Sequence, residues 1–114
     1  MSVQHFEAAI RTNGQVAIID LRGEINGLAE QQLNEAYELV DVSQPENILL
    51  NFNQVDYINS TGIALIVSLL AQARKAHRTL SVCGLSPHYQ EIFNITRLSD
   101  FMTIYPDEAS ATAG

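Results

Sequence analysis

Hydrophobic and polar positions follow two different periodicities along the chain. Two apolar segments, 6–11 and 16–21, are separated by Asn13-Gly14, a dipeptide typical of β-hairpin turns. From Asn26 onward the apolar positions recur every three or four residues, as on one face of an amphipathic helix; they are Ala29, Leu33, Ala36, Tyr37 and Val40. The pattern predicts a strand hairpin followed by a helix with Asn26 as its N-cap.

The remainder of the chain repeats the order of strand and helix. Residues 48–50 are continuously apolar, which is typical of a strand covered on both faces. We expect, in order, a strand over 47–52, a helix over 62–76, a strand over 79–83, a helix opened by Ser86 and Pro87, and a short strand over 101–105. Strands joined by helices form a largely parallel sheet. The sequence therefore predicts an α/β fold, with a mixed, mostly parallel sheet of four to five strands and helices packed on it.

A single domain accounts for this pattern. The chain has 114 residues, which fits one domain of ordinary size. Neither a linker nor a repeat interrupts residues 1–108, which we assign to that domain. Residues 109–114 are mostly small, and we expect them to form a flexible C-terminal tail.

The charge balance argues against nucleic acid and membranes as partners. Thirteen acidic and six basic residues give a net charge of −7, which disfavours binding to nucleic acid or to an anionic membrane. The first twenty residues carry no secretory signal, and the longest apolar region, 63–73, is too short to cross a bilayer. The lone cysteine, Cys83, excludes an internal disulfide. We therefore expect a cytoplasmic protein.

Residues suited to catalysis or metal binding are not clustered in the sequence. A Gly-rich phosphate loop with a lysine is absent, and so are paired cysteines at metal-binding spacing. His5, His77 and His88 are far apart and are expected at the surface, and Cys83 is expected in the core. We predict that the chain is not an enzyme and holds no cofactor or metal.

The segment Asn59-Ser60-Thr61-Gly62 combines two hydroxyl side chains with the predicted start of a helix. The first turn of a helix has unpaired N–H groups and the positive end of the helix dipole, and both stabilise a phosphate. Gly62 has no side chain, so another chain or a phosphate can approach closely. Ser60 has two compatible interpretations, as the N-cap of the helix or as a residue that is phosphorylated.

The helix that follows has one apolar face and one mixed face. The apolar face is expected to be buried and consists of Ile63, Ile66, Val67, Leu70 and Ala73. The mixed face carries Leu65 among Thr61, Ser68, Gln72 and Lys75. Leu65 is either an ordinary, partly exposed leucine or a contact residue for a partner that docks over the turn.

Three segments of the chain resemble the successive signatures of STAS domains. They are Leu21-Arg22-Gly23-Glu24-Ile25-Asn26, Ile48-Leu49-Leu50-Asn51-Phe52 and Tyr57-Ile58-Asn59-Ser60-Thr61-Gly62-Ile63-Ala64-Leu65. The resemblance spans about residues 16–105 and is closest to bacterial anti-sigma factor antagonists. It implies a STAS fold and a protein that regulates transcription through protein partners.

In the family that the chain resembles, the unphosphorylated antagonist binds an anti-sigma factor and so frees a sigma factor. That anti-sigma factor is also a serine kinase of the GHKL type, which uses ATP to phosphorylate a serine in the turn and is then released; a PP2C-type phosphatase restores the binding form. By position this serine corresponds to Ser60, with Thr61 as second choice. We predict that the partner-binding residues are Asn26, Asn59, Thr61, Gly62 and Leu65.

Two positions depart from the family pattern. The family usually has aspartate immediately before the serine, where this chain has Asn59, and after the Gly-Glu-hydrophobic segment, where it has Asn26. Both replacements remove a carboxylate and keep a hydrogen-bonding side chain. The alternative within the same family is a scaffold or sensor domain that is never phosphorylated and regulates a target other than a sigma factor.

Overall fold

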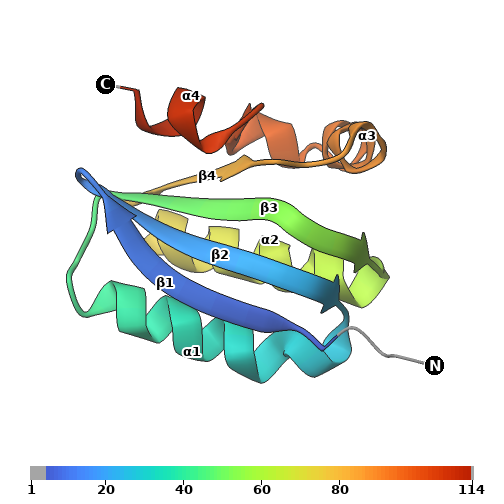
Figure 1. Cartoon of the computed structure of the whole chain (residues 1–114), viewed down its shortest axis with the longest axis horizontal. Coiled ribbons are helices and arrows are strands. Elements are labelled where there is room, and N and C mark those ends of the chain that lie inside the picture. Colours follow the sequence, from blue (N-terminus) through green and yellow to red (C-terminus); the bar gives the residue numbers. More distant parts are fainter. Residues whose placement is uncertain (1–4, 114) are drawn as a thin grey trace.

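The computed structural model describes residues 5–113, which form strands and helices in alternation (Figure 1). In chain order the elements are β1 (Glu7–Asn13), β2 (Val16–Ile25), the 3₁₀ helix η1 (Gly27–Ala29), α1 (Glu30–Asp41), β3 (Asn47–Ile58), α2 (Ser60–Lys75), β4 (Thr79–Cys83), α3 (Pro87–Ile95), the 3₁₀ helix η2 (Leu98–Asp100), β5 (Thr103–Tyr105) and α4 (Glu108–Thr112). The predicted order of elements is confirmed as far as β5.

The strands form one sheet in the order β1-β2-β3-β4-β5. β1 and β2 pair antiparallel as a hairpin, and each later strand pairs parallel to the strand before it. α1, α2 and α3 each connect two parallel neighbours, because parallel strands need a long crossover connection. The prediction of a mixed, mostly parallel sheet of four to five strands is confirmed, with five strands.

The hairpin between β1 and β2 closes through a two-residue turn. Asn13 pairs with Val16, and Gly14 occupies the first central position of the turn with φ +63°. A positive φ at this position is typical of a type II′ turn, for which glycine is the preferred residue. The hairpin predicted from Asn13-Gly14 is therefore confirmed.

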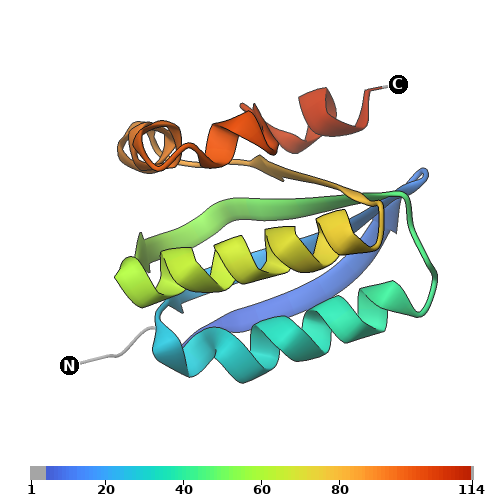
Figure 2. The same cartoon turned by 180° about the vertical axis from the view of Figure 1, so that it is seen from behind.

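Helices α1 and α2 lie side by side on one face of the sheet (Figure 2). In β3, Ile48 and Leu50 belong to the core beneath these helices, whereas Leu49 packs with Ile18 and Cys83 on the opposite face. All five side chains are buried, so the apolar segment of β3 is covered on both faces as predicted. Burial raises the pKa of the Cys83 thiol to about 11, in keeping with a core residue.

Helix α3 joins the core from the edge of the sheet away from α1 (Figure 1). Ser86 is its N-cap and accepts a hydrogen bond from the N–H of Tyr89 at 3.3 Å, and Pro87 is the first helical residue. Phe93 is fully buried and meets the ring of Phe52 on β3 edge to face, with 6.0 Å between the ring centroids. The predicted start of this helix is confirmed.

The segment expected to be a flexible tail contains helix α4 instead. Asp107 caps this helix by accepting from the N–H of Ser110 at 2.8 Å, and Ala111 packs against the cluster formed by Ile18, Leu49 and Cys83. The small residues therefore cover the second face of the sheet over part of its area.

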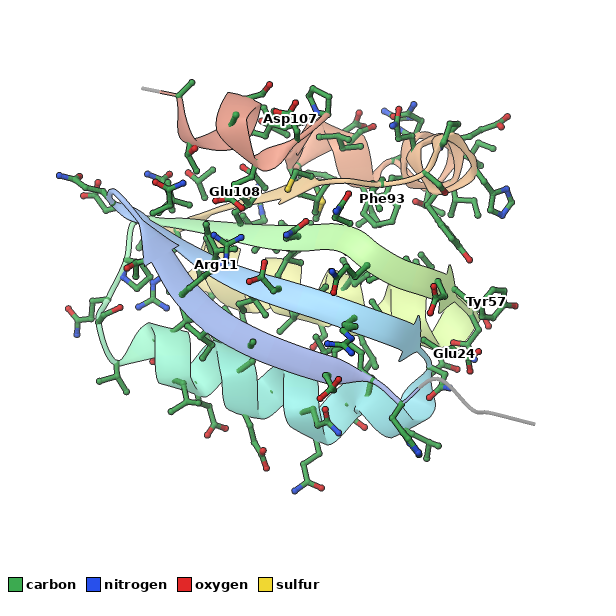
Figure 3. The ribbon with its side chains drawn as sticks, viewed as in Figure 1. Arg11, Glu24, Tyr57, Phe93, Asp107 and Glu108 are labelled. Carbon is green, nitrogen blue, oxygen red and sulfur yellow. The ribbon has the colours of Figure 1, made fainter. Side chains whose placement is uncertain are left out.

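An ion cluster on the open face of the sheet holds α4 to the hairpin. Figure 3 shows Arg11 and Glu108 close together. The Arg11 guanidinium donates to both carboxylate oxygens of Glu108 and to Asp20 at 2.6 and 3.0 Å, and Asn13 donates to Glu108 at 3.0 Å. Hydrogen bonds from Arg11 and then Asn13 lower the pKa of Glu108 to about 2, and Arg11 also lowers the pKa of Asp20.

The ion cluster predicts a small, pH-dependent contribution to stability. The pKa of Glu108 is lowered in the folded chain from 4.5, so its contribution is complete above the unfolded value and is lost as the pH falls towards 2. We expect Glu108→Gln to lower the free energy of unfolding by less than about 1 kcal/mol at pH 7, because the pair is partly exposed. Urea unfolding of both proteins between pH 2 and 7 measures this. A difference that stays constant with pH would show that the ion pair contributes nothing.

Two strands are longer than predicted, and one face of α2 differs. β2 continues to Ile25 and β3 to Ile58, because the strands remain paired through two register shifts beyond their apolar parts. In α2, Leu69 is 1% exposed and Val67 is 45% exposed, so the placement of Val67 on the buried face is wrong. Val67 and Leu69 are both apolar, and the helical pattern alone does not show which of them is buried. The packing of α2 against the sheet determines it.

Candidate functional site

The turn at residues 59–62 lies where β3 ends and α2 begins. Asn59 is the N-cap of α2, because its backbone is extended and its side-chain Oδ1 accepts a hydrogen bond from the N–H of Gly62 at 2.8 Å. Ser60 is the first residue of the helix, so the prediction that Ser60 caps it is wrong. Asn and Ser are similarly favoured as N-caps, and their order alone does not select one.

Of the four backbone N–H groups at residues 59–62, two donate hydrogen bonds and two have no acceptor among residues 5–113. The N–H of Asn59 donates to the carbonyl of Ile25 at 3.1 Å, and that of Gly62 donates to the Asn59 side chain. Among the hydrogen bonds of residues 5–113, the N–H groups of Ser60 and Thr61 find no acceptor. They are the groups that a phosphate on this turn would meet first.

Gly62 is buried against the backbone of β2. A Cβ at this position would lie 2.2 Å from the carbonyl oxygen of Ile25 and 2.9 Å from Cγ2 of Ile58. The glycine is therefore required for the close approach of α2 to β2, which is a different reason from the access that we expected. A contact of Gly62 with a partner stays a prediction.

Asn26 lies beside the turn, just after the end of β2. Its Oδ1 accepts from the N–H of Leu28 at 2.8 Å, and its Nδ2 donates to Glu24 at 2.7 Å. Asn26 therefore caps η1, which leads into α1, and not α1 itself. The parallel register pairs Glu24 with Tyr57, so the strand ends that carry Asn26 and Asn59 are adjacent.

A tyrosine from α3 holds the strand end that precedes the turn. The Tyr89 hydroxyl accepts a hydrogen bond from the N–H of Ile58 at 2.8 Å and donates to the carbonyl of the same residue at 3.4 Å. Tyr89 is buried. Nothing in its spacing signals this contact, which makes Tyr89 a positioning residue for the turn.

Two exposed apolar side chains belong to the segments that adjoin the turn. η1 contacts the start of α2, and a Cβ on Gly27 would lie 3.5 Å from the methyl carbon of Thr61. In η1, Leu28 is 90% exposed, and Tyr57 at the end of β3 is 51% exposed. Sequence analysis missed both residues, although Leu28 is an apolar residue outside the helical pattern of α1.

We call these residues the Ser60 surface, which comprises Glu24, Asn26, Leu28, Tyr57, Ser60 and Thr61. Figure 3 shows Glu24 and Tyr57 at the same end of the sheet. Ser60 and Thr61 are exposed, and Asn26 and Asn59 are half-buried. Leu65 lies about one turn further along α2, half-buried and packed on the core. Of the predicted site residues, the structure thus brings all but Leu65 and the buried Gly62 together at the surface.

The charge around the Ser60 surface is negative. The segments 24–28 and 56–62 contain Glu24 and Asp56 and no Lys or Arg. The basic residues of α2, Arg74 and Lys75, lie at the other end of the helix. A phosphate at Ser60 would be stabilised by the helix N-terminus, and segments 24–28 and 56–62 offer it no Lys or Arg.

Residues 5–113 contain no group of three or more His, Cys, Asp or Glu side chains arranged to hold a metal ion. His5, His77 and His88 are exposed, as predicted. In this part of the chain every helix is too short or too polar to span a bilayer.

Two named relatives are similar to this chain in sequence. BtrV of Bordetella bronchiseptica, assigned to the anti-sigma factor antagonists, is 34% identical over 98 residues, which cover 82% of this chain and 81% of BtrV. The anti-sigma-B factor antagonist of Listeria monocytogenes is 30% identical over 86 residues, which cover 75% of each chain. Both relatives are named as regulatory proteins and not as enzymes.

Solved structures and a family model agree with these relatives. An anti-sigma factor antagonist from Mycobacterium paratuberculosis matches with a TM-score of 0.82 at 17% identity, covering 96% of this chain and 92% of that chain. The phosphorylated form of SpoIIAA, a Bacillus cell fate determinant, matches with a TM-score of 0.70 at 17% identity, covering 96% and 98%. At these identities the matches establish the fold. The sequence model of the STAS domain matches residues 7–111, and the chain therefore belongs to the STAS domain family.

Proposed function

We propose that this chain is an anti-sigma factor antagonist whose partner binding is switched by phosphorylation of Ser60. In the unphosphorylated state the Ser60 surface binds an anti-sigma factor, which then releases its sigma factor. In the phosphorylated state this complex dissociates. The proposal places the chain in the cytoplasm, with the sigma factor and ATP.

The observation that carries the proposal is the position of the Ser60 hydroxyl. Ser60 is exposed at the start of α2, and Asn59 already caps the helix, so a phosphate on Ser60 would remove no cap. The open N–H groups of Ser60 and Thr61 and the helix dipole favour a negative charge there, typically by about 0.3–1 kcal/mol. The fold is therefore suited to both states of Ser60.

Loss of the complex follows from what surrounds Ser60. A partner that covers Leu28 and Tyr57 would also bury the group on Ser60, because all three belong to one surface. A phosphate adds roughly −1.5 to −2 charges beside Glu24, with no Lys or Arg of this chain nearby. Burying that charge without a counter-charge is costly, so the phosphorylated chain binds poorly.

The proposed partners come from the family and from the names of the relatives. The anti-sigma factor would also be a GHKL-type serine kinase, and a PP2C-type phosphatase would restore Ser60. A protein of the same fold, SpoIIAA, has been solved in its phosphorylated form. Asn59 retains the cap that an aspartate would form, so the helix start keeps its geometry without the carboxylate. The proposed contact residues are Asn26, Asn59, Thr61, Gly62 and Leu65, together with Leu28 and Tyr57.

We expect phosphorylation of Ser60 by the partner that this surface binds. A tagged Ser60→Ala variant captures the partner from native cells, and mass spectrometry identifies it. The purified partner is then incubated with the wild-type chain and ATP, and the modified peptide is mapped. The expected result is an anti-sigma factor that adds one phosphate to Ser60.

Ser60→Ala serves as the negative control for the site in the same assay. If the phosphate were found on Thr61 alone, the phosphorylated residue of the switch would be Thr61 and not Ser60. A chain that binds the anti-sigma factor but accepts no phosphate would contradict the switch. That result would favour the unphosphorylated scaffold or sensor, which agrees with the missing carboxylates at Asn26 and Asn59.

A further inference from the structure

A second candidate interaction surface lies along β1, away from the Ser60 surface. β1 stands at the edge of the sheet, so its outer side has no strand partner among residues 5–113. Figure 1 shows β1 on the outside of the sheet, with α1 running beneath it. The C-terminal half of α1 points towards the end of the sheet opposite to the start of α2 (Figure 1).

The outer edge of β1 presents free backbone groups in a regular row. The pairing with β2 runs without a register shift from Glu7 to Asn13, and β1 contains no proline. In a hairpin with a two-residue turn, the two residues that flank the turn form a hydrogen-bonded pair. Hydrogen-bonded and non-hydrogen-bonded pairs then alternate along the two strands. Counting from Asn13, the N–H and C=O groups of Ala8, Ile10 and Thr12 face outward. Two of the usual protections against strand pairing, a proline and a β-bulge, are thus absent from β1.

A groove runs beside this edge. It has a volume of about 460 Å³ and is lined by Ala8 and Ile10 from β1 and by Gln32, Glu35, Ala36 and Leu39 from α1. A neighbouring hollow shares Glu35 and Leu39 and extends to Glu38 and Val42. Leu39 is 66% exposed and Val42 is 81% exposed, so the groove has an apolar surface that this chain leaves uncovered.

The negative charge of the groove indicates which kind of partner can bind there. α1 carries Glu30, Glu35, Glu38 and Asp41 and has no Lys or Arg. Of these, Asp41 is paired with Arg78, whereas Glu35 and Glu38 belong to the rim of the groove. A second copy of this chain would bring the same carboxylates together, which is unfavourable. A partner with Lys or Arg among apolar residues is complementary.

We propose that the outer edge of β1 and the groove beside α1 bind an extended, basic segment of a partner protein, which adds to the sheet as a sixth strand. The backbone of the segment pairs with Ala8, Ile10 and Thr12. Every second side chain of the segment faces α1; among these, apolar side chains enter the groove beside Leu39, and Lys or Arg side chains meet Glu35 and Glu38. Main-chain pairing provides affinity and the groove provides selectivity, as in other strand-addition complexes.

The test uses a defined peptide with a matched control. An acetylated and amidated decapeptide, in which every second residue is in turn valine or lysine and the residues between them are threonine, is titrated into the isotope-labelled chain, and amide chemical shifts are followed by NMR. We expect the largest shifts at Ala8, Ile10 and Leu39. The control peptide is N-methylated at its valines, which keeps its charge but removes the N–H groups that would pair with β1. We expect it to bind at least about tenfold more weakly, as losing backbone hydrogen bonds predicts.

Variants of the chain separate the contributions of backbone and charge. Thr12→Pro removes an outward N–H and leaves the pairing with β2 intact, so it should weaken binding of the peptide. Circular dichroism should show that the variant remains folded. Glu35→Lys should also weaken binding of the peptide, whereas Glu91→Lys, the same change in charge on α3, should not. Ser60→Asp should leave peptide binding unchanged, which separates this proposal from the phosphorylation switch.

Three results would overturn the proposal. Equal affinity of the N-methylated peptide would show attraction by charge without strand addition. Shifts centred elsewhere than β1 and α1 would place the peptide on another surface. Dimerisation of the chain without peptide, abolished by Thr12→Pro in sedimentation measurements, would show that a second copy occupies the edge.

Discussion

Ser60→Asp is expected to weaken binding of the anti-sigma factor by about 100-fold or more, whereas Ser60→Ala should bind like the wild type. The aspartate adds a second negative charge to the Ser60 surface, which already carries Glu24 and which the partner would bury, and truncated or uncompensated charge contacts typically cost 2–5 kcal/mol at interfaces. Alanine adds neither charge nor bulk at this position. Titration calorimetry with the captured partner measures both affinities.

The control for this prediction is Ser68→Asp. Ser68 is exposed on the same helix but two turns further along, and it receives the same change in charge. We expect its affinity to stay close to that of the wild type. The fold should tolerate Ser60→Asp, since an acidic residue in the first turn of a helix stabilises it by about 0.3–1 kcal/mol. Equal losses for the two variants, or none for Ser60→Asp, would rule out Ser60 as the centre of the interface.

Gly62→Ala is expected to destabilise the chain by roughly 3 kcal/mol, although alanine is the better helix former. The new Cβ would lie 2.2 Å from the carbonyl oxygen of Ile25, so either α2 or the end of β2 has to move. The same carbonyl accepts the N–H of Asn59, and its displacement would also disturb the cap. Urea unfolding measures the loss.

Gly27→Ala provides the matched control, because its Cβ would make an ordinary contact of 3.5 Å with Thr61. We expect a change within about 0.5 kcal/mol, as for most surface substitutions. If Gly62→Ala were as stable as Gly27→Ala, the close approach of α2 to β2 would not require a glycine.

The order and direction of the elements were predictable because they depend on local patterns. The apolar residues Ile48, Leu49 and Leu50 identified a strand covered on both faces, and Ser86 with Pro87 identified the start of α3. These signals arise from burial periodicity and from capping, which act over a few residues. The place of Ser60 at the start of α2 followed from the same kind of signal.

The end of β3 and the role of the C-terminal segment were not predictable in this way. Residues 53–57 leave the continuously apolar pattern of the strand, with Asn53, Gln54 and Asp56 among them, and they are extended because they pair with β2 across its register shifts. The small residues of α4 carry no packing signal, and the helix is held by Glu108 against Arg11, 97 positions earlier in the chain. Such contacts depend on segments that only the folded chain brings together.

The sequence by itself determined the fold class, the family resemblance and the position of two hydroxyls at the start of a helix. Only the tertiary structure decided that Asn59 takes the cap, that Gly62 is buried under Ile25, and that Gly27 of η1 lies against Thr61. The physical reason is that the helix start is placed by the ends of β2 and β3, and these ends are set by strand pairing and by the Tyr89 hydroxyl.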